Sequence, residues 1–304
     1  PTSWLRFLST HFLTKIINRG INDLIPASYR SVITIKYKGN QMPFTAKLLM
    51  LSPWLLYILI NAVFIGTSIL ILYIVKRVAH YKIRQSHNDV IASIFNKAGT
   101  VFGIMIAFVV VILWQDYNKA VDSAIKEGTE ALELYQDLRL YPNQKQAGSA
   151  INSLTNFANL VIDDEYPAMA NMRMSPTTEH AMNNLRNAIH NIKPQNRQEQ
   201  ILYANILNDL ENLSKLRDDR LSEMESSLPG IVWGALIVGA FVAILFSSLL
   251  GAERFGLHAL LISMVAVILA TAFYLIIELD YPFMGELRAK PTSYIKMLKT
   301  IEIK

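Results

Sequence analysis

The run IASIFNKAGTVFGIMIAFVVVILW, residues 91–114, decides the structural class of this protein. It is 24 residues long and holds a single charged residue, Lys97. A helix of about 20 mostly apolar residues is long enough to cross the hydrocarbon core of a bilayer. The run therefore predicts a transmembrane helix, and the polar stretch HNDV (87–90) directly before it marks where this helix begins.

Three further apolar runs, at residues 54–75, 231–250 and 257–279, have a similar length and almost no charge. Inside a bilayer only helices and closed barrels satisfy their backbone polar groups, and runs of this length fit helices. The sequence therefore predicts an all-α, polytopic membrane protein with four transmembrane helices. The lipid bilayer is its first expected partner.

Charge is unevenly distributed along the chain. Residues 115–228 hold 11 basic and 17 acidic residues, a net charge of −6, whereas the whole chain carries +5. Prolines at 142, 167, 176, 194 and 229 divide this acidic block into segments that have apolar residues at every third or fourth position. This pattern predicts a bundle of helices inserted between spans two and three, with outer helices that continue into these spans.

These patterns divide the chain into five parts. We expect an N-terminal extension (1–51), spans one and two (52–116), an acidic extramembrane helical bundle (117–228), spans three and four (229–280) and a C-terminal tail (281–304). In the extension, apolar residues at helical spacing beside Arg6, Lys15 and Arg19 predict an amphipathic helix.

Span two has two different faces when it is drawn as a helix with about 100° per residue. One face is polar near the preceding loop and small in the middle: Asp89, Asn96, Thr100, Gly103, Ala107 and Val110. Two interpretations fit this face. It packs closely against other helices, or it lines a pore across an oligomer, with a polar mouth and a narrow apolar neck. The two are compatible, because a pore helix also packs sideways.

Polar residues gather where span two begins. Arg84, His87, Asn88 and Lys97 are candidate residues of a pore mouth. Asn88 or Asp89 could instead cap the helix by accepting hydrogen bonds from its first backbone N–H groups. Lys97 lies further inside the span, where it either extends its ammonium group to the interface or acts as a charge at the pore mouth.

Small residues at four-residue spacing occur in spans two and three. Gly99 precedes Gly103 in span two, and span three aligns Ala235, Gly239 and Ala243. This spacing lets two helix backbones approach closely, so Gly99 and the three residues of span three are interpreted as helix-packing positions.

No motif in the sequence indicates catalysis. The absence of cysteine excludes thiolate metal sites, and the histidines lack paired ligand spacing. We therefore expect no enzyme, no cofactor, no bound metal and no nucleic-acid partner. Two polar clusters remain. Asp163-Asp164-Glu165 is interpreted as a solvated acidic cluster, with a cation site as the alternative. Asp218-Asp219, between Arg217 and Arg220, is interpreted as solvated helix surface.

Five stretches occur in an order that resembles one family: HNDV (87–90), IAFVVVILW (106–114), IDDEYPAMA (162–170), FSSLLGAERFGLH (246–258) and LDYPFMGELRAKP (279–291). Over residues 54–300 the chain resembles the bestrophin-like family of bacterial membrane proteins. The family is distantly similar to bestrophins, which are pentameric anion channels with four spans per subunit. The resemblance implies that span two lines a pore and that the chain is a multi-pass protein of the bacterial inner membrane.

The expected function is an oligomeric ion channel of bestrophin-like type. We expect a homo-oligomer, a tetramer or pentamer, that conducts small inorganic ions through a pore lined by span two. The alternative is a non-conducting membrane sensor or scaffold subunit that uses the helical bundle as its interaction domain.

Overall fold

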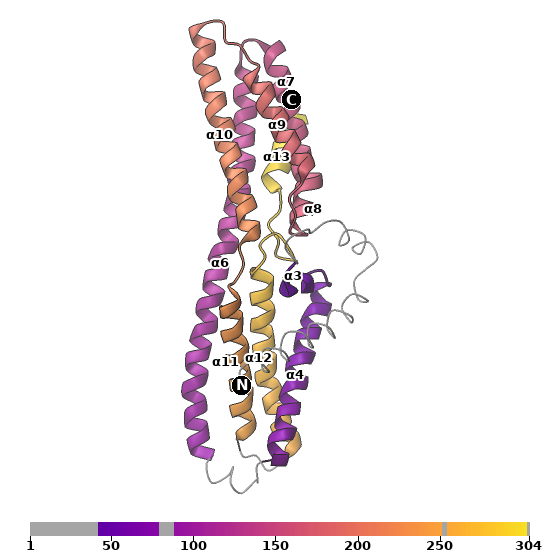
Figure 1. Cartoon of the computed structure of the whole chain (residues 1–304), viewed down its shortest axis with the longest axis vertical. Helices are drawn as coiled ribbons and strands as arrows, with labels where there is room; N and C mark the ends of the chain where they lie inside the picture. Colours follow the sequence, from indigo (N-terminus) through magenta and orange to yellow (C-terminus); the bar gives the residue numbers. More distant parts are fainter. Residues whose placement is uncertain (1–41, 79–87, 251–253, 303–304) are drawn as a thin grey trace, which may run out of the picture. The chain divides into compact units, whose positions relative to one another are not determined.

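The computed structural model describes residues 42–78, 88–250 and 254–302, and the regular elements within these residues are all helices (Figure 1). They are α3 (Phe44–Leu48), α4 (Pro53–Val78), α6 (Asn88–Leu140), α7 (Gln144–Leu160), the π-helix η1 (Val161–Glu165), α8 (Tyr166–Met169), α9 (Pro176–His190), α10 (Arg197–Glu225), α11 (Gly230–Leu249), α12 (Phe255–Leu279) and α13 (Thr292–Glu302). Four of these elements carry segments long and apolar enough to cross a membrane. The predicted all-α, four-span fold is confirmed.

The chain divides into two compact units, Pro1–Leu56 and Tyr57–Lys304. In the first unit, the described part contains α3, a short helix that follows Pro43, and the start of α4 at Pro53. The amphipathic helix expected near residues 4–19 lies outside the described residues. The second unit holds the remainder of α4 and all the helices that come after it.

Helix α6 links the membrane-spanning part of the second unit to the bundle without interruption. It contains 53 residues and no proline, so at about 1.5 Å per residue it extends for about 80 Å. Its N-terminal half packs against α11 and α12, and its C-terminal half packs against α7, α10 and α13 (Figure 1). The expected continuation of span two into the bundle is therefore present. By contrast, α10 and α11 are separated by residues 226–229, where Pro229 lacks the N–H that a continuous helix needs.

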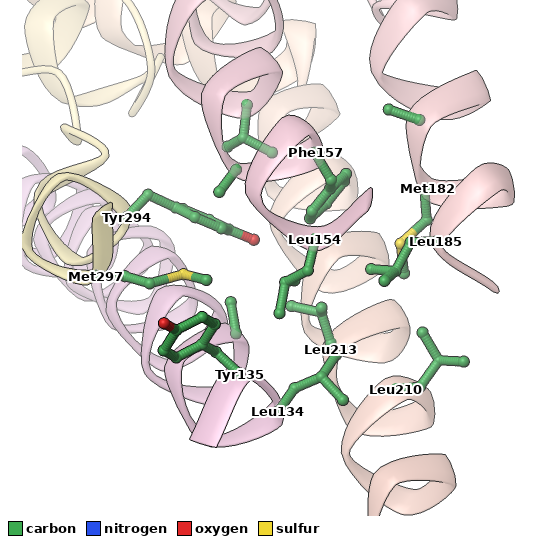
Figure 2. Close-up of a cluster of buried hydrophobic side chains, with 14 of the residues drawn as sticks. Leu134, Tyr135, Leu154, Phe157, Met182, Leu185, Leu210, Leu213, Tyr294 and Met297 are labelled. Atoms are coloured by element: carbon green, nitrogen blue, oxygen red, sulfur yellow. The ribbon is translucent and has the colours of Figure 1, made fainter. Parts of the chain in front are cut away.

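The bundle is held together by one hydrophobic core. Figure 2 shows side chains from five helices that meet there: Leu134 and Tyr135 of α6, Leu154 and Phe157 of α7, Met182 and Leu185 of α9, Leu210 and Leu213 of α10, and Tyr294 and Met297 of α13. Three of these helices begin at side chains that accept a hydrogen bond from the backbone: Asn143 before α7, Ser175 before α9 and Asn196 before α10. Such caps fix where each helix begins.

The C-terminal segment belongs to this core. Phe283, Ala289, Tyr294 and Met297 are buried among the bundle helices. Helix α13 approaches α6 most closely at Gly128, where a Cβ atom would lie 2.5 Å from the Ser293 Cβ and 2.9 Å from the Tyr294 N. Only glycine permits this approach, because any Cβ atom would overlap α13.

The spans associate mainly through aromatic and small residues. Helix α4 meets α12 where the Tyr57 and Tyr274 rings lie edge to face at 5.4 Å, and where Phe64 and Phe273 are 5.0 Å apart. Helices α11 and α12 pack on each other and on α6. Because lipid tails are as apolar as leucine, such close packing is what drives helices together in a membrane.

Candidate functional site

The spanning half of α6 is exposed along most of its surface, on its bulky apolar face as well as on its polar face. Val109 and Leu113 are buried against the chain's own helices. The predicted pore-lining residues lie elsewhere on the helix: Asp89, Asn96, Thr100, Gly103 and Ala107 are exposed, and Val110 is half-buried. The chain therefore leaves almost all of the predicted polar and small face uncovered by its own helices.

An uncovered polar face has a physical consequence in a membrane. The Thr100 hydroxyl donates to the Asn96 backbone carbonyl at 2.7 Å, so this hydroxyl is satisfied within the helix. The Asn96 amide and the Asp89 carboxylate are exposed on the same helix. Polar groups that face lipid are unfavourable by several kcal/mol, at order of magnitude, so such faces normally meet water or another protein surface.

The predicted mouth residues are only partly described. Asn88 is the first residue of α6 and is half-buried, and Lys97 is exposed. Arg84 and His87 lie outside the described residues.

The predicted packing residues differ in their surroundings. Gly239 of α11 lies directly beneath the Phe102 ring of α6, where a Cβ atom would come within 2.2 Å of the ring. Ala243 is half-buried and Ala235 is exposed. Gly99 is half-buried, and a Cβ atom there would meet nothing within 4 Å. Of the two glycines, only Gly239 lies at a close contact between helices.

We expect Gly239→Ala to weaken the contact between α6 and α11. The added methyl group overlaps the Phe102 ring, which must turn away, and overpacking of this kind costs about 1–3 kcal/mol. The measurement is the thermal unfolding temperature of the purified full chain in detergent. Gly234→Ala is the matched control, because a Cβ atom at Gly234 meets nothing within 4 Å. Equal unfolding temperatures for the two variants would contradict this packing role.

Away from the spans, the bundle encloses a network of buried charges. The Arg220 guanidinium is fully buried and donates to Glu127 and to Glu165, with Nη2 3.0 Å from Glu127 Oε1 and 2.5 Å from Glu165 Oε2. Arg217 donates to the same Glu165 carboxylate at 2.5 Å and to Glu179 at 2.7 Å. The network joins α6, η1, α9 and α10.

Aromatic residues complete the network. The Tyr294 hydroxyl of α13 donates to Glu127 Oε1 at 2.8 Å, and the Arg220 guanidinium lies 5.0 Å from the centre of the Tyr166 ring. Two buried arginines balance two buried glutamates, so Glu127, Glu165, Arg217 and Arg220 together carry no net charge. Buried charges persist only when they are paired in this way.

The network sets the ionisation of Glu165. Burial raises the pKa of this carboxyl, but Arg220 and Arg217 outweigh burial and hold the pKa below its ordinary value of 4.5. The arginines bind the ionised carboxylate, so Glu165 stabilises the folded protein fully at pH values above its ordinary pKa of 4.5. This stabilisation is lost as the pH falls through the lowered pKa. Burial and the Glu127 charge raise the pKa of the Tyr294 hydroxyl well above 10, so it remains a donor.

One sequence interpretation is wrong at this network, and another is confirmed beside it. Glu165 is not part of a solvated acidic cluster, because its side chain is buried and paired with Arg217 and Arg220. Asp218 and Asp219 are exposed, as predicted, whereas the arginines on either side of them are buried. No group of acidic or histidine side chains suited to a metal ion occurs in the described part of the chain. The overlooked signal was spacing: Arg217 and Arg220 follow Leu213 by four and seven residues and so lie on the buried face of α10.

A family model described as the bestrophin-like domain matches residues 62–294. The chain belongs to the bestrophin-like family. It is accordingly a multi-pass membrane protein of that family, as its sequence motifs suggested. No curated protein matches the chain.

Solved structures share the fold of this bestrophin-like protein. Crystal structures of single-substitution variants of a bacterial bestrophin homologue from Klebsiella pneumoniae are similar. One has a TM-score of 0.55 and 15% identity over 81% of this chain and 95% of the homologue. Another has a TM-score of 0.54 and 14% identity over 86% and 97%. A structure described as a membrane protein has a TM-score of 0.55 and 14% identity over 81% and 96%. At these identities the likeness concerns the fold alone.

Proposed function

We propose that this bestrophin-like chain is one subunit of a homo-oligomeric ion channel, a tetramer or pentamer, in which the spanning half of α6 lines the pore. The observation that carries the proposal is the exposed face of α6, which bears Asp89, Asn96, Thr100 and Gly103 where a single chain would offer them to lipid. Several copies arranged around an axis would remove this conflict, because these side chains would then face water.

The same arrangement assigns a role to each part of the face. Asp89 and Asn96, with Asn88 and Lys97 nearby, form a polar mouth that attracts small inorganic ions. Gly103, Ala107 and Val110 form a narrow apolar neck. The bestrophins that this family resembles are oligomeric anion channels, which supports conduction as the activity and the bacterial inner membrane as the location.

We expect Gly103→Leu to reduce single-channel conductance severalfold in planar bilayers. In a single chain the larger side chain fits, because a Cβ atom at Gly103 meets nothing within 4 Å. Around an axis the same side chain would narrow the neck of every subunit at once. Gly234→Leu is the matched control, since Gly234 is also exposed, with open space at its Cβ. It should conduct like the unmodified protein.

The oligomer itself needs a separate measurement. Light scattering of the purified variants should give the same subunit number for Gly103→Leu and Gly234→Leu. An assembled, folded oligomer that passes no current and has no axial cavity would overturn the channel proposal. It would favour the non-conducting sensor or scaffold, whose interaction domain is the bundle.

A further inference from the structure

The connections between spans and bundle meet at one buried carboxylate, Asp280. This residue ends α12, where its backbone N–H bonds to the Ile276 carbonyl at 3.0 Å. Its side chain accepts a hydrogen bond from the Leu228 N–H at 2.6 Å. Leu228 lies in the connection from α10 to α11, and the residues after Asp280 lead from α12 to the bundle core. Asp280 therefore ties one connection to the other.

Helix α6 is the third connection between the spans and the bundle, and the charge of its Asp116 acts on the Asp280 carboxylate. Asp116 of α6 lies close enough to disfavour ionisation of Asp280. On α12 itself, the Glu278 carboxylate accepts the Glu286 N–H at 3.1 Å. The linker from α10 contributes the Leu228 N–H, and α11 contributes the Trp233 indole.

Asp280 has little compensation for its own charge. The residue is only 2% exposed. Its Oδ2 atom has no hydrogen-bond partner of good geometry among the residues that the structure describes. Lys119, one turn after Asp116 on α6, is paired with Glu223 of α10 at 2.5 Å. An ionised Asp280 would thus be a buried negative charge held by one backbone N–H and an indole, beside a second carboxylate.

We propose that protonation of Asp280 controls the contact between the bundle and the spans. We call the hydrogen bond between the Asp280 side chain and the Leu228 N–H the tie. In its protonated form Asp280 holds the connection between α10 and α11 against the end of α12. In its ionised form it favours an arrangement in which the carboxylate is hydrated and this connection separates from α12. This conformational equilibrium does not depend on whether the chain conducts ions.

The direction of the effect follows from linkage. Burial raises the pKa of Asp280 above its ordinary value of 3.8, and the charge of Asp116 raises it further. The hydrogen bonds from Leu228 and Trp233 lower the pKa, and the net result is a pKa of about 6. The tied arrangement therefore binds the proton more tightly than a hydrated one. The tie should therefore be strongest below the ordinary pKa of 3.8 and should weaken as the pH rises towards about 6, above which it weakens no further. A difference of about two pKa units corresponds to about a hundredfold change in the opening equilibrium.

Hydrogen exchange of the Leu228 amide tests the tie directly. The full chain in lipid nanodiscs would be labelled between about pH 3.5 and about pH 8, with rates corrected for the intrinsic pH dependence of exchange. We expect protection of residues 226–230 to fall by up to about a hundredfold as the pH rises from 3.8 to about 6, and to stay constant above that pH. Peptides from α7, which does not contact Asp280, should keep constant protection.

Two variants sharpen the test. Asp280→Asn is neutral at every pH and nearly the same size, so it should retain the acid-state protection throughout. Asp218→Asn, which removes an exposed carboxylate of α10, should behave like the unmodified protein. Should Asp280→Asn fail to fold, the titration of the unmodified chain still decides the matter. Protection that is flat across the pH range, or that changes equally in α7, would overturn the proposal.

Discussion

Arg220→Met is expected to destabilise the bundle by about 3–5 kcal/mol, which is the usual result of removing one partner from a buried ion pair. Glu165 would keep Arg217, but Glu127 would keep only the Tyr294 hydroxyl. Glu127 is fully buried, so its negative charge would be left without a counter-ion. The measurement is global hydrogen exchange of the core amides of α6 and α10 in the full chain.

A second substitution separates lost charge balance from lost packing. In Glu127→Gln/Arg220→Met both charges are gone, and most of the stability should return, since paired buried charges and apolar residues of similar volume are often equivalent. Lys215→Met is the matched control in the same helix, because Lys215 is exposed and its loss should change stability by about 0.5 kcal/mol or less. If Arg220→Met were as stable as Lys215→Met, the network would have no structural role.

Gly128→Ala should displace α13 from the bundle. The new methyl group would lie 2.5 Å from Ser293 and 2.9 Å from backbone atoms of α13. Backbone cannot turn aside as a flexible side chain can, so the helices must separate. We expect a loss of about 2–3 kcal/mol despite the higher helix propensity of alanine. Hydrogen exchange of the α13 amides should accelerate more than hydrogen exchange of the α7 amides.

Gly148→Ala provides the comparison for this effect. Gly148 lies within α7, and a Cβ atom there meets nothing within 4 Å. This substitution should be neutral or stabilising by up to about 1 kcal/mol, from helix propensity alone. A Gly128→Ala variant with unchanged α13 exchange would show that α13 tolerates a shift of position, contrary to its tight approach to α6.

The sequence was sufficient for the spans because their signal is local. A run such as residues 231–250 has the length and composition of a membrane helix whatever surrounds it. The uninterrupted course of α6 was also predictable, since no proline breaks the pattern between residues 91 and 140. The polar face of span two followed from helical periodicity, and its exposure in the folded chain is the observation on which the channel proposal depends.

Only the tertiary structure decided which polar residues are buried and what pairs with them. Glu127 and Arg220 are 93 positions apart, and Glu127 and Tyr294 are 167 apart. No local pattern relates residues at such separations, because their pairing arises from how α6, α10 and α13 pack. The tie between Asp280 and Leu228 has the same origin. The sequence by itself determined a four-span helical membrane protein, whereas packing decided where its buried charges lie, because a charge is stable in a core only where folding brings its partner to it.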